Sequence, residues 1–333
     1  MIPAAIPRVP LGTWPTPLQP LPRLGEEVGC SLYVKRDDMT GLGGGGNKAR
    51  KLEYHLGQAV AEGATHVITT GSVQSNHCHL TAAAARRLGL MPILILVSNP
   101  PGAATGNLLL DRLMDADVRF VASGSAERAM DGAARQITRD GGRPHVIPEG
   151  GSDALGSFGY MGAVDEIRLQ LTADRGEVLR PLVVVANGSC GTHAGLLAGA
   201  LASWPELTIL GISVSGDPAV KVGKTARLAS EALALAGITR AVGPEAVWID
   251  GSYKGPDYGV LTDACRGAIR LAARSEGLFL DPVYTGKALA GLIDLGGRGR
   301  LAGFDAVVLV HSGGFASLFD PGFDLLEKEH ADV

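Results

Sequence analysis

Residues 182–195, LVVVANGSCGTHAG, decide the fold that this chain is expected to adopt. Residues 182–186 form a continuous apolar run, which is typical of a strand buried on both faces of a parallel sheet. The glycines at 188, 191 and 195 then permit a tight turn into residues 192–202, a predicted helix rich in alanine and leucine. A strand that passes through a glycine-rich turn into a helix is half of a βαβ unit and indicates an α/β fold.

The same alternation covers most of the chain. We predict strands at residues 66–70, 93–97, 119–122, 145–147, 182–186, 208–213 and 306–311. We predict helices at residues 75–88, 108–115, 126–139, 192–202, 224–236, 260–276 and 287–295. Such alternation predicts parallel sheets, whose ligands bind beyond the carboxyl ends of the strands.

Length and composition narrow the class of protein. The 333 residues predict about two domains, and 46% hydrophobic with 19% charged residues can build a large core. The 30 basic and 34 acidic residues give a net charge of −4, which argues against a nucleic-acid-binding protein. No apolar run approaches the roughly 20 residues that span a membrane, and residues 1–14 do not resemble a signal peptide. We therefore expect a cytoplasmic protein without membrane association.

The four cysteines are scattered at positions 30, 78, 190 and 265, without a CxxC pair. Free thiols are therefore expected, and a structural zinc site is not. His77, Cys78 and His79 are adjacent, but three consecutive residues cannot all face one point from a helix. We expect no metal in this protein.

Residues 41–51, GLGGGGNKARK, form the most unusual loop. They do not match a Walker A loop, because Asn47 stands between the last glycine and Lys48, and Ala49 follows where serine or threonine is required. No strand runs directly into these glycines, which excludes the dinucleotide fingerprint as well. Two interpretations remain: a flexible loop that opens a helix of surface lysines, or a loop that holds Lys48 as a reactive amine. The N-terminus of a helix lowers the pKa of a lysine, as an amine that attacks a carbonyl requires.

Two further loops lie between a predicted strand and a helix. In residues 71–79, Ser75 or Asn76 can cap the helix, but with Gln74 they exceed what a cap needs and suit a substrate carboxylate. In residues 187–195, backbone N–H groups with the hydroxyls of Ser189 and Thr192 can form a phosphate site, although a simple turn remains the alternative. A small phosphate fits better than a dinucleotide, since no acidic residue ends the next strand. The glycines beside Cys190 supply no base that would make it a nucleophile.

The loops at residues 281–287, DPVYTGK, and 311–314, HSGG, complete a pattern. The chain resembles the fold-type II pyridoxal phosphate (PLP) enzymes, and most closely the 1-aminocyclopropane-1-carboxylate deaminase / D-cysteine desulfhydrase family. The segments that carry the resemblance, in the family's order and spacing, are GGNKARKLEY, GSVQSNHC, NGSCGTHAGL, DPVYTGKALAGL and HSGG. It extends from residues 16–24 to residues 311–314, nearly the whole chain.

The resemblance implies a two-domain, tryptophan synthase β-like fold with parallel-rich sheets flanked by helices. A large PLP-binding domain would comprise residues 1–45 and 159–333, and a small inserted α/β domain residues 47–158. PLP would lie between the two domains. The resemblance also implies a homodimer that acts on a small amino acid.

The resemblance assigns roles to individual residues. The catalytic set is Lys48, Ser75, Tyr258 and Tyr284. Lys48 would hold the cofactor through its amine, Asn76 (preferred to Asn47) would contact the ring hydroxyl, and Ser312 would lie at the pyridine nitrogen. The phosphate would be held by Gly188, Ser189, Cys190, Gly191 and Thr192, with Asn187 at its edge. The substrate would be bound by Gln74, Ser75, Asn76 and Thr285.

The deaminase branch typically reads DPVYEGK and HLGG, whereas this chain has Thr285 and Ser312 at those places. That resembles the desulfhydrase branch, and a hydroxyl beside the pyridine nitrogen suffices to eliminate a good leaving group such as hydrosulfide. We therefore predict α,β-elimination of D-cysteine to pyruvate, ammonia and sulfide. L-Cysteate sulfo-lyase and cyclopropane deaminase are alternatives, as are, outside this class, a nucleotide-binding oxidoreductase and an inactive amino-acid-binding module. His79 replaces an arginine and Asp153 an asparagine that desulfhydrase relatives commonly carry, so both are suspected of influencing the substrate.

Overall fold

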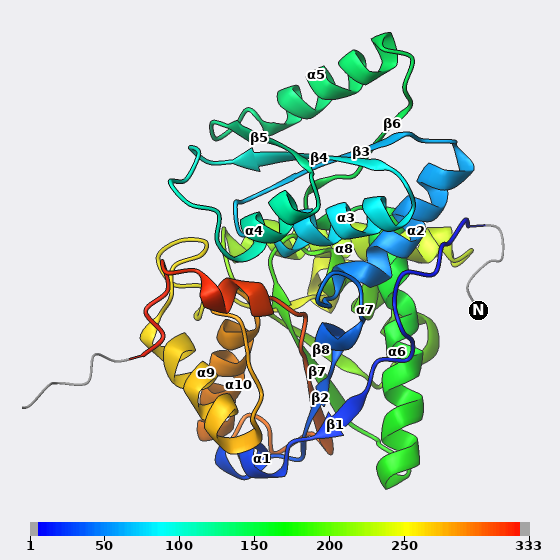
Figure 1. Cartoon of the computed structure of the whole chain (residues 1–333). Helices are drawn as coiled ribbons and strands as arrows, with labels where there is room; N and C mark the ends of the chain where they lie inside the picture. The colour runs from blue at the N-terminus through cyan, green and yellow to red at the C-terminus, as the bar shows by residue number, and fades with distance from the viewer. Residues whose placement is uncertain (1–5, 327–333) are drawn as a thin grey trace, which may run out of the picture.

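The strands form two separate sheets in the computed structural model, which describes residues 6–326 (Figure 1). The larger sheet contains, in spatial order, β1 (Leu18–Pro20), β2 (Leu32–Lys35), β10 (Ala306–Val310), β7 (Pro181–Asn187), β8 (Thr208–Ser213) and β9 (Trp248–Asp250). The smaller sheet contains β5 (Asp117–Val121), β4 (Met91–Val97), β3 (His66–Gly71) and β6 (Pro144–Val146). All neighbouring strands are parallel except β1 and β2, which confirms the parallel-rich α/β prediction.

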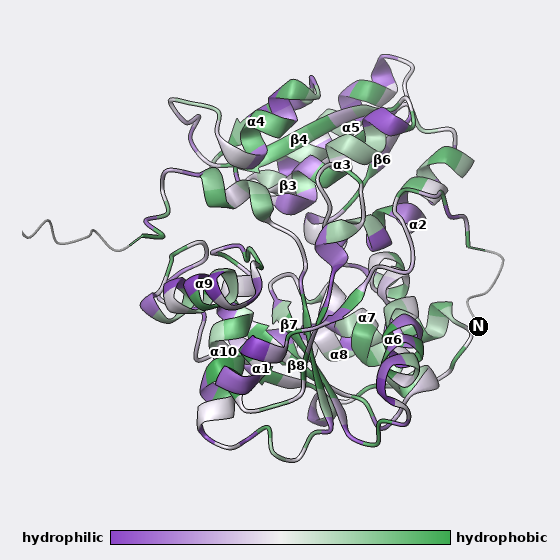
Figure 2. Ribbon diagram, turned by 60° about the horizontal axis from the view of Figure 1, so that its bottom comes forward, coloured by the Kyte–Doolittle hydropathy of each residue, from purple (hydrophilic) through white to green (hydrophobic). Residues whose placement is uncertain are grey.

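Helices cover both faces of the larger sheet (Figure 1). One face carries α1 (Pro22–Val28), α9 (Asp263–Glu276) and α10 (Thr285–Gly297), and the other α6 (Ala154–Arg175), α7 (Gly191–Ser203) and α8 (Pro218–Leu235). Side chains of β7 alternate between the faces: Leu182 and Val184 pack toward α10, whereas Val183 and Val185 pack toward α6 and α7. Apolar residues are therefore needed at successive positions from 182 to 185, and Figure 2 shows the strands of this sheet as hydrophobic ribbons between the helices.

The smaller sheet is also covered on both faces. Helix α5 (Ala126–Arg139) packs on one face through Met130, Ala133 and Ile137. Helices α2 (Lys48–Ala61), α3 (Asn76–Arg87) and α4 (Gly106–Leu113) pack on the other. Short 3₁₀ helices lie at η1 (Asp37–Met39), η2 (Glu149–Gly151), η3 (Pro244–Ala246) and η4 (Phe315–Phe319).

The longest helix, α6, was not predicted. Its first part, ALGSFGYMG, contains three glycines and resembles a loop. The structure uses Gly159 for close packing, because a Cβ there would collide with the backbone carbonyl of Arg50 in α2. The predicted domain boundary at residues 158 and 159 falls within this helix. The domain limits therefore stay a prediction, and their ends at residues 1–5 and 327–333 lie outside the described residues.

A buried charge network anchors α2. The Arg50 guanidinium donates to both carboxylate oxygens of Asp37 at 2.8 Å and to those of Glu166 at 2.7 and 2.8 Å. Its guanidinium carbon also lies 4.2 Å from the centre of the Trp14 ring. The network joins η1, α2 and α6, and it therefore fixes the start of the helix that carries Lys48.

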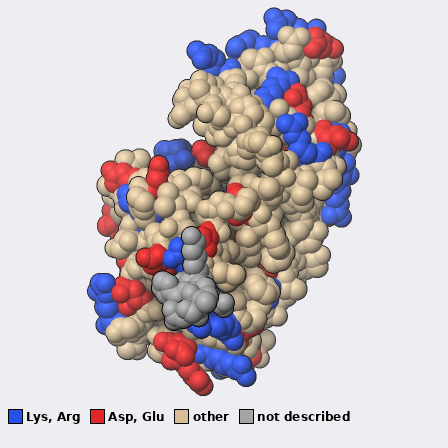
Figure 3. All heavy atoms as spheres, turned by 60° about the vertical axis from the view of Figure 1, so that its left-hand side comes forward, with Lys and Arg blue, Asp and Glu red and all other residues tan. Residues whose placement is uncertain are grey.

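Within residues 6–326, no helix combines the length and apolar character that crossing a membrane requires. Figure 3 shows basic and acidic side chains interspersed over one face of the molecule. Such mixing agrees with the small net charge of −4.

Candidate active site

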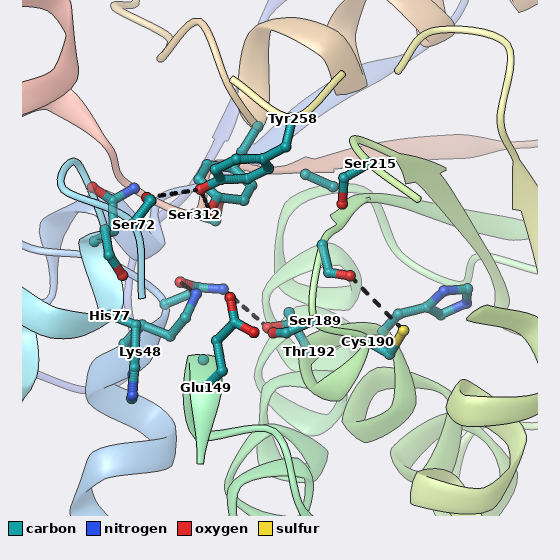
Figure 4. A pocket seen from close by; sticks show the side chains of 18 of the residues that line it. Lys48, Ser72, His77, Glu149, Ser189, Cys190, Thr192, Ser215, Tyr258 and Ser312 are labelled. Atoms are coloured by element: carbon teal, nitrogen blue, oxygen red, sulfur yellow. Dashed lines mark hydrogen bonds between the residues drawn. The ribbon is translucent and has the colours of Figure 1, made fainter. Parts of the chain in front are cut away.

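Loops from both sheets surround a cavity of about 270 Å³ (Figure 4). It lies beyond the carboxyl ends of β3, β7, β8 and β10, where parallel strands direct their connecting loops. Of the predicted site residues, the cavity is lined by Lys48, Ser75, Asn76, Gly188, Ser189, Cys190, Thr192, Tyr258, Tyr284 and Ser312. Loops that are far apart in the sequence thus converge on one point.

The glycine loop places Lys48 against the end of β10. Gly46 forms an isolated antiparallel bridge with Gly313, and the Asn47 N–H donates to the Ser312 carbonyl at 3.0 Å. A Cβ on Gly313 would lie 2.8 Å from the Gly46 Cα, so two glycines are required for the backbones to come this close. The Lys48 side chain enters the cavity, and its Nζ donates to Asn47 Oδ1 at 2.9 Å.

Burial lowers the pKa of Lys48 to about 8, although the charge of Asp281 acts in the opposite direction. A neutral amine is therefore accessible near physiological pH. This is the form that attacks a carbonyl or accepts a proton.

The turn after β7 leads into the N-terminus of α7. Cys190 adopts a left-handed conformation with φ of 76°, which directs the following N–H groups toward the cavity end of the helix. Asn47 Nδ2 donates to Thr192 Oγ1 at 2.9 Å, and the Ser189 and Ser152 hydroxyls are 2.7 Å apart. Hydroxyls and a helix N-terminus meet here, as a phosphate site requires.

Lys51 supplies an amine that was not among the predicted site residues. Its buried Nζ donates to the Gly150 carbonyl at 3.1 Å and to Ser152 Oγ at 3.0 Å. Burial, followed by the charge of Lys48, lowers its pKa well below the usual value. A Cβ on Gly191 would lie 2.7 Å from this nitrogen, so the lysine is directly against the start of α7. Lys51 follows Lys48 by three residues on the same helix, and this spacing, which puts both side chains on one face, could have identified Lys51 from the sequence.

The start of α3 forms the opposite wall. Ser75 is the N-cap, and its hydroxyl accepts from the Cys78 N–H at 3.2 Å. Asn76 lies beside it, with its Oδ1 accepting from Asn107 at 2.8 Å. Both line the cavity at a helix N-terminus, where a carboxylate is favoured.

His77 also lines the cavity, and its tautomer follows from its partner. The Thr69 hydroxyl donates to the Ile147 carbonyl at 2.8 Å, so the His77 Nε2 must donate to Thr69 Oγ1 at 2.7 Å. The other ring nitrogen is then unprotonated and has no hydrogen-bond partner within the described residues. Burial lowers the pKa of His77 well below its usual value, so the ring stays neutral.

Two tyrosines meet at the edge of the cavity. The hydroxyls of Tyr258 and Tyr284 are 2.6 Å apart, and Ser72 Oγ lies 3.5 Å from that of Tyr258. Burial, followed by the neighbouring Tyr258, raises the pKa of Tyr284 well above its usual value. Tyr284 therefore keeps its proton, and its hydroxyl can donate or accept a hydrogen bond or act as a weak acid.

Four predicted residues do not line the cavity. The amide of Gln74 accepts from the Asn107 N–H at 2.8 Å and donates to the Thr105 carbonyl at 3.1 Å. The fully buried Thr285 hydroxyl donates to Asp281 at 2.6 Å. Asn187 and Gly191 are also absent from the lining, and Asn187 Nδ2 lies 2.9 Å from Nδ1 of the His193 ring. These residues support the walls through neighbouring protein groups.

The two departures from the desulfhydrase pattern also lie outside the cavity lining. Asp153 is the N-cap of α6 and accepts from the Gly156 N–H at 2.8 Å. The His79 ring nitrogen lies 3.0 Å from the Gly43 carbonyl and holds the glycine loop. Each side chain has a structural partner and neither is part of the cavity lining, so their influence on the substrate stays a prediction.

The residues present fit PLP. Lys48 provides an amine of lowered pKa, and the α7 N-terminus with Ser189, Thr192 and nearby Lys51 provides a phosphate site. Ser312 also lines the cavity, and its carbonyl accepts from the N–H of Asn47, the residue before Lys48. These groups would hold the aldehyde, the phosphate and the ring, respectively.

Comparisons with known proteins agree with this chemistry. Residues 9–313 match the family described as "Pyridoxal-phosphate dependent enzyme". A Klebsiella pneumoniae protein named D-cysteine desulfhydrase is 41% identical over 320 residues, which cover 94% of this chain and 95% of the relative. A Pyrococcus horikoshii protein, provisionally named a 1-aminocyclopropane-1-carboxylate deaminase, is 41% identical over 326 residues, 97% of this chain and 96% of its own length. A solved structure titled "Crystal Structure Analysis of the ACC deaminase homologue" superposes with a TM-score of 0.87 at 40% identity, covering 97% of this chain and 96% of that one.

Proposed function

Because this chain belongs to the family of pyridoxal-phosphate dependent enzymes, we propose that it is a lyase that eliminates the β-substituent of D-cysteine or a closely related small amino acid. The observation that carries the proposal is the convergence of Lys48, the α3 N-terminus and the Tyr258–Tyr284 pair on one cavity. This arrangement provides a base, a carboxylate site and an acid around a single small molecule. Thr285 and Ser312, hydroxylic where the deaminase branch has glutamate and leucine, favour the desulfhydrase reaction.

The proposed reaction converts D-cysteine and water into pyruvate, ammonia and hydrogen sulfide. PLP, when bound, supplies an aldehyde for an amine and a ring that accepts the electron pair released at Cα. Ser75 and Asn76 orient the substrate carboxylate at the α3 N-terminus. Lys48 Nζ, in its neutral form, takes the Cα proton.

Departure of the β-sulfur requires a proton donor. The Tyr284 hydroxyl lies at the cavity edge and holds a proton that it can donate, and Tyr258, 2.6 Å away, can replace that proton from the side of Ser72 and solvent. We assign the tyrosine pair to protonation of the leaving sulfur. The released 2-aminoacrylate then takes up water and yields pyruvate and ammonia.

The test is pyruvate release from purified, PLP-loaded protein given D-cysteine, with Lys48→Ala as the inactive control. Release by the wild type and none by the variant is the expected result. An intact cofactor absorbance without pyruvate would refute D-cysteine as substrate.

The names of the Pyrococcus relative and the solved homologue favour a second candidate, cyclopropane deaminase. That reaction converts the cyclopropane amino acid and water into 2-oxobutyrate and ammonia. Release of 2-oxobutyrate exceeding pyruvate release from D-cysteine would replace the first proposal with this one.

We further propose a cytoplasmic homodimer, for which the family resemblance is the support. Light scattering of the purified holoenzyme should give twice the chain mass of 34.3 kDa. A monomer mass would refute the dimer.

A further inference from the structure

One acidic side chain in the cavity has no role in the proposed chemistry. Glu149 is the first residue of η2, and its side chain points into the cavity (Figure 4). It is exposed to the cavity and forms no hydrogen bond or ion pair with any residue in the range 6–326. An unpaired carboxylate in a ligand cavity influences which charges can bind there.

Contacts of Gly150 hold the backbone next to Glu149 in place. The next residue, Gly150, has a φ of +68°, and a Cβ on it would lie 2.9 Å from the Ser189 Cβ. Lys51 donates to the Gly150 carbonyl from the other side. The η2 backbone is thus held between the turn after β7 and α2, which places Glu149 on the cavity wall beside the phosphate site.

Several ionisable side chains line the cavity or lie against it. At the phosphate end, burial lowers the pKa of Lys51, and the positive charge of Lys224, which also lines the cavity, acts in the same direction. At the tyrosine end, burial first and Tyr258 next raise the pKa of Tyr284, and the charge of Glu149 adds to this effect. Glu149 and the tyrosine pair line the same small cavity, so the charge of Glu149 also acts where the β-substituent would leave.

We propose that Glu149 determines specificity by charge: it disfavours amino acids with an anionic β-substituent, such as a sulfonate, and favours those with a neutral or cationic one. The inference rests on the proposed function in one respect, that a β-substituted amino acid binds in this cavity. It places L-cysteate below D-cysteine among the candidate substrates, because a cysteine thiol is mostly neutral near pH 7.

The size of the effect follows from Coulomb's law. The α-carboxylate and α-amine are common to all amino acids, so their interactions with Glu149 cancel when two ligands are compared. A second charge about 7 Å from the carboxylate, at an effective dielectric constant of about 20, changes affinity by roughly tenfold to a hundredfold. This exceeds the error of a binding titration.

The decisive variant is Glu149→Gln, which removes the charge and keeps the size. Glu127→Gln in the first turn of α5, on the outer face of the smaller sheet, removes an equal charge far from the cavity and serves as the control. Holoenzyme is titrated with alanine, aspartate and 2,3-diaminopropionate, and binding is followed by the visible absorbance of the cofactor. These ligands carry an uncharged, an anionic and a cationic side group.

In Glu149→Gln, we expect aspartate to gain at least tenfold in affinity relative to alanine, and 2,3-diaminopropionate to lose about as much. Opposite shifts distinguish a charge effect from a structural defect, which would weaken all three ligands. The Glu127→Gln ratios should stay within twofold of wild type. Unchanged ratios in Glu149→Gln, or failure of all three amino acids to bind the wild type, would overturn the inference.

Kinetics separate this inference from the proposed function. With β-chloroalanine and cysteate of the same configuration, Glu149→Gln should raise kcat/KM for cysteate relative to β-chloroalanine by tenfold or more. If the wild type eliminates neither compound nor D-cysteine, the lyase proposal fails, while the titration still decides the role of Glu149. If the wild type prefers cysteate to β-chloroalanine, the charge filter is refuted and the lyase class is retained.

Discussion

Replacing Asp281 with asparagine should destabilise the turn that positions Tyr284 and lower the pKa of Lys48. The fully buried carboxylate accepts four hydrogen bonds: Oδ2 from the N–H groups of Val283 and Tyr284 at 2.9 and 2.8 Å, and Oδ1 from the Thr285 N–H and hydroxyl at 2.7 and 2.6 Å. These bonds form the turn that begins α10 and sets the position of Tyr284. Asparagine has a single acceptor oxygen, so it cannot reproduce them.

The size of the stability loss in Asp281→Asn depends on which way the new side-chain amide is turned, and the more favourable orientation sets it. With the NH₂ group at the Oδ1 position, the Thr285 hydroxyl can rotate to accept from it, but the Thr285 N–H loses its acceptor. One unsatisfied buried N–H costs about 1–3 kcal/mol, and the two remaining bonds to Val283 and Tyr284 weaken because the acceptor is neutral. We expect a loss of about 2–4 kcal/mol in the free energy of unfolding.

Calorimetry measures this loss as a shift in Tm. At about 2.1 cal/mol/K per residue, a chain of 333 residues that unfolds as one unit should lose roughly 3–6 °C in Tm. Asp263→Asn is the matched control, because that aspartate starts α9 but its side chain is 97% exposed. We expect its Tm to change by less than about 1 °C.

The same variant provides a second, electrostatic readout. The charge of Asp281 raises the pKa of Lys48, which burial lowers to about 8. Removing that charge should lower this pKa further, so that PLP capture by the apoprotein reaches its half-maximal rate at a lower pH than in the wild type. An unchanged Tm together with an unchanged pH midpoint would refute our account of Asp281.

Three further predictions test the amine, the phosphate site and the anchor of α2. The rate at which wild-type apoprotein captures PLP, followed by visible absorbance, should rise with pH up to about 8 and then level off, because the lowered pKa of Lys48 sets the neutral fraction; a rise that continues to pH 10 would contradict this. Lys51→Met should weaken PLP binding by about 10- to 100-fold in an equilibrium titration, which is the effect expected for one charge-assisted hydrogen bond. The control is Lys287→Met, which removes a buried lysine outside the cavity lining and should change PLP binding by less than threefold. Arg50→Met should cost about 3–5 kcal/mol of stability in chemical denaturation, because Asp37 becomes an unpaired buried charge; a loss below 1 kcal/mol would show that the network is dispensable.

Much of the α/β pattern could be predicted from local sequence. The helix at residues 126–139 and the strand at residues 208–213 match α5 and β8 to the residue, because hydrophobic periodicity and flanking turns specify both. Helix α8 begins at Pro218, six residues before its predicted start at residue 224, since Asp217 caps it and Pro218 suits the first helical position. Segments β1, α1 and β2 were not predicted. Their short lengths of 3, 7 and 4 residues carry little periodicity.

The sequence by itself determined the chemical groups of this protein: a lysine after a run of glycines, polar residues at the start of a helix, and a glycine-rich turn after a buried strand. Local backbone preferences are sufficient for these features, because glycine, capping residues and apolar runs act over a few neighbouring positions. Their meeting at one cavity could also be expected, since parallel strands direct their loops to the same edge.

Only the tertiary structure decided which of these groups face the cavity. Thr285 is bound by Asp281, and Gln74 by the loop before α4, so neither lines the cavity, whereas Lys51 lies against the phosphate site and Glu149 enters the cavity. The physical reason is that a side chain hydrogen-bonds to whichever partner is nearest in space. The partner of Gln74 lies 33 residues away in sequence, and although Asp281 is only 4 residues from Thr285, whether this bonded pair faces the cavity is fixed only when the sheets and helices have packed.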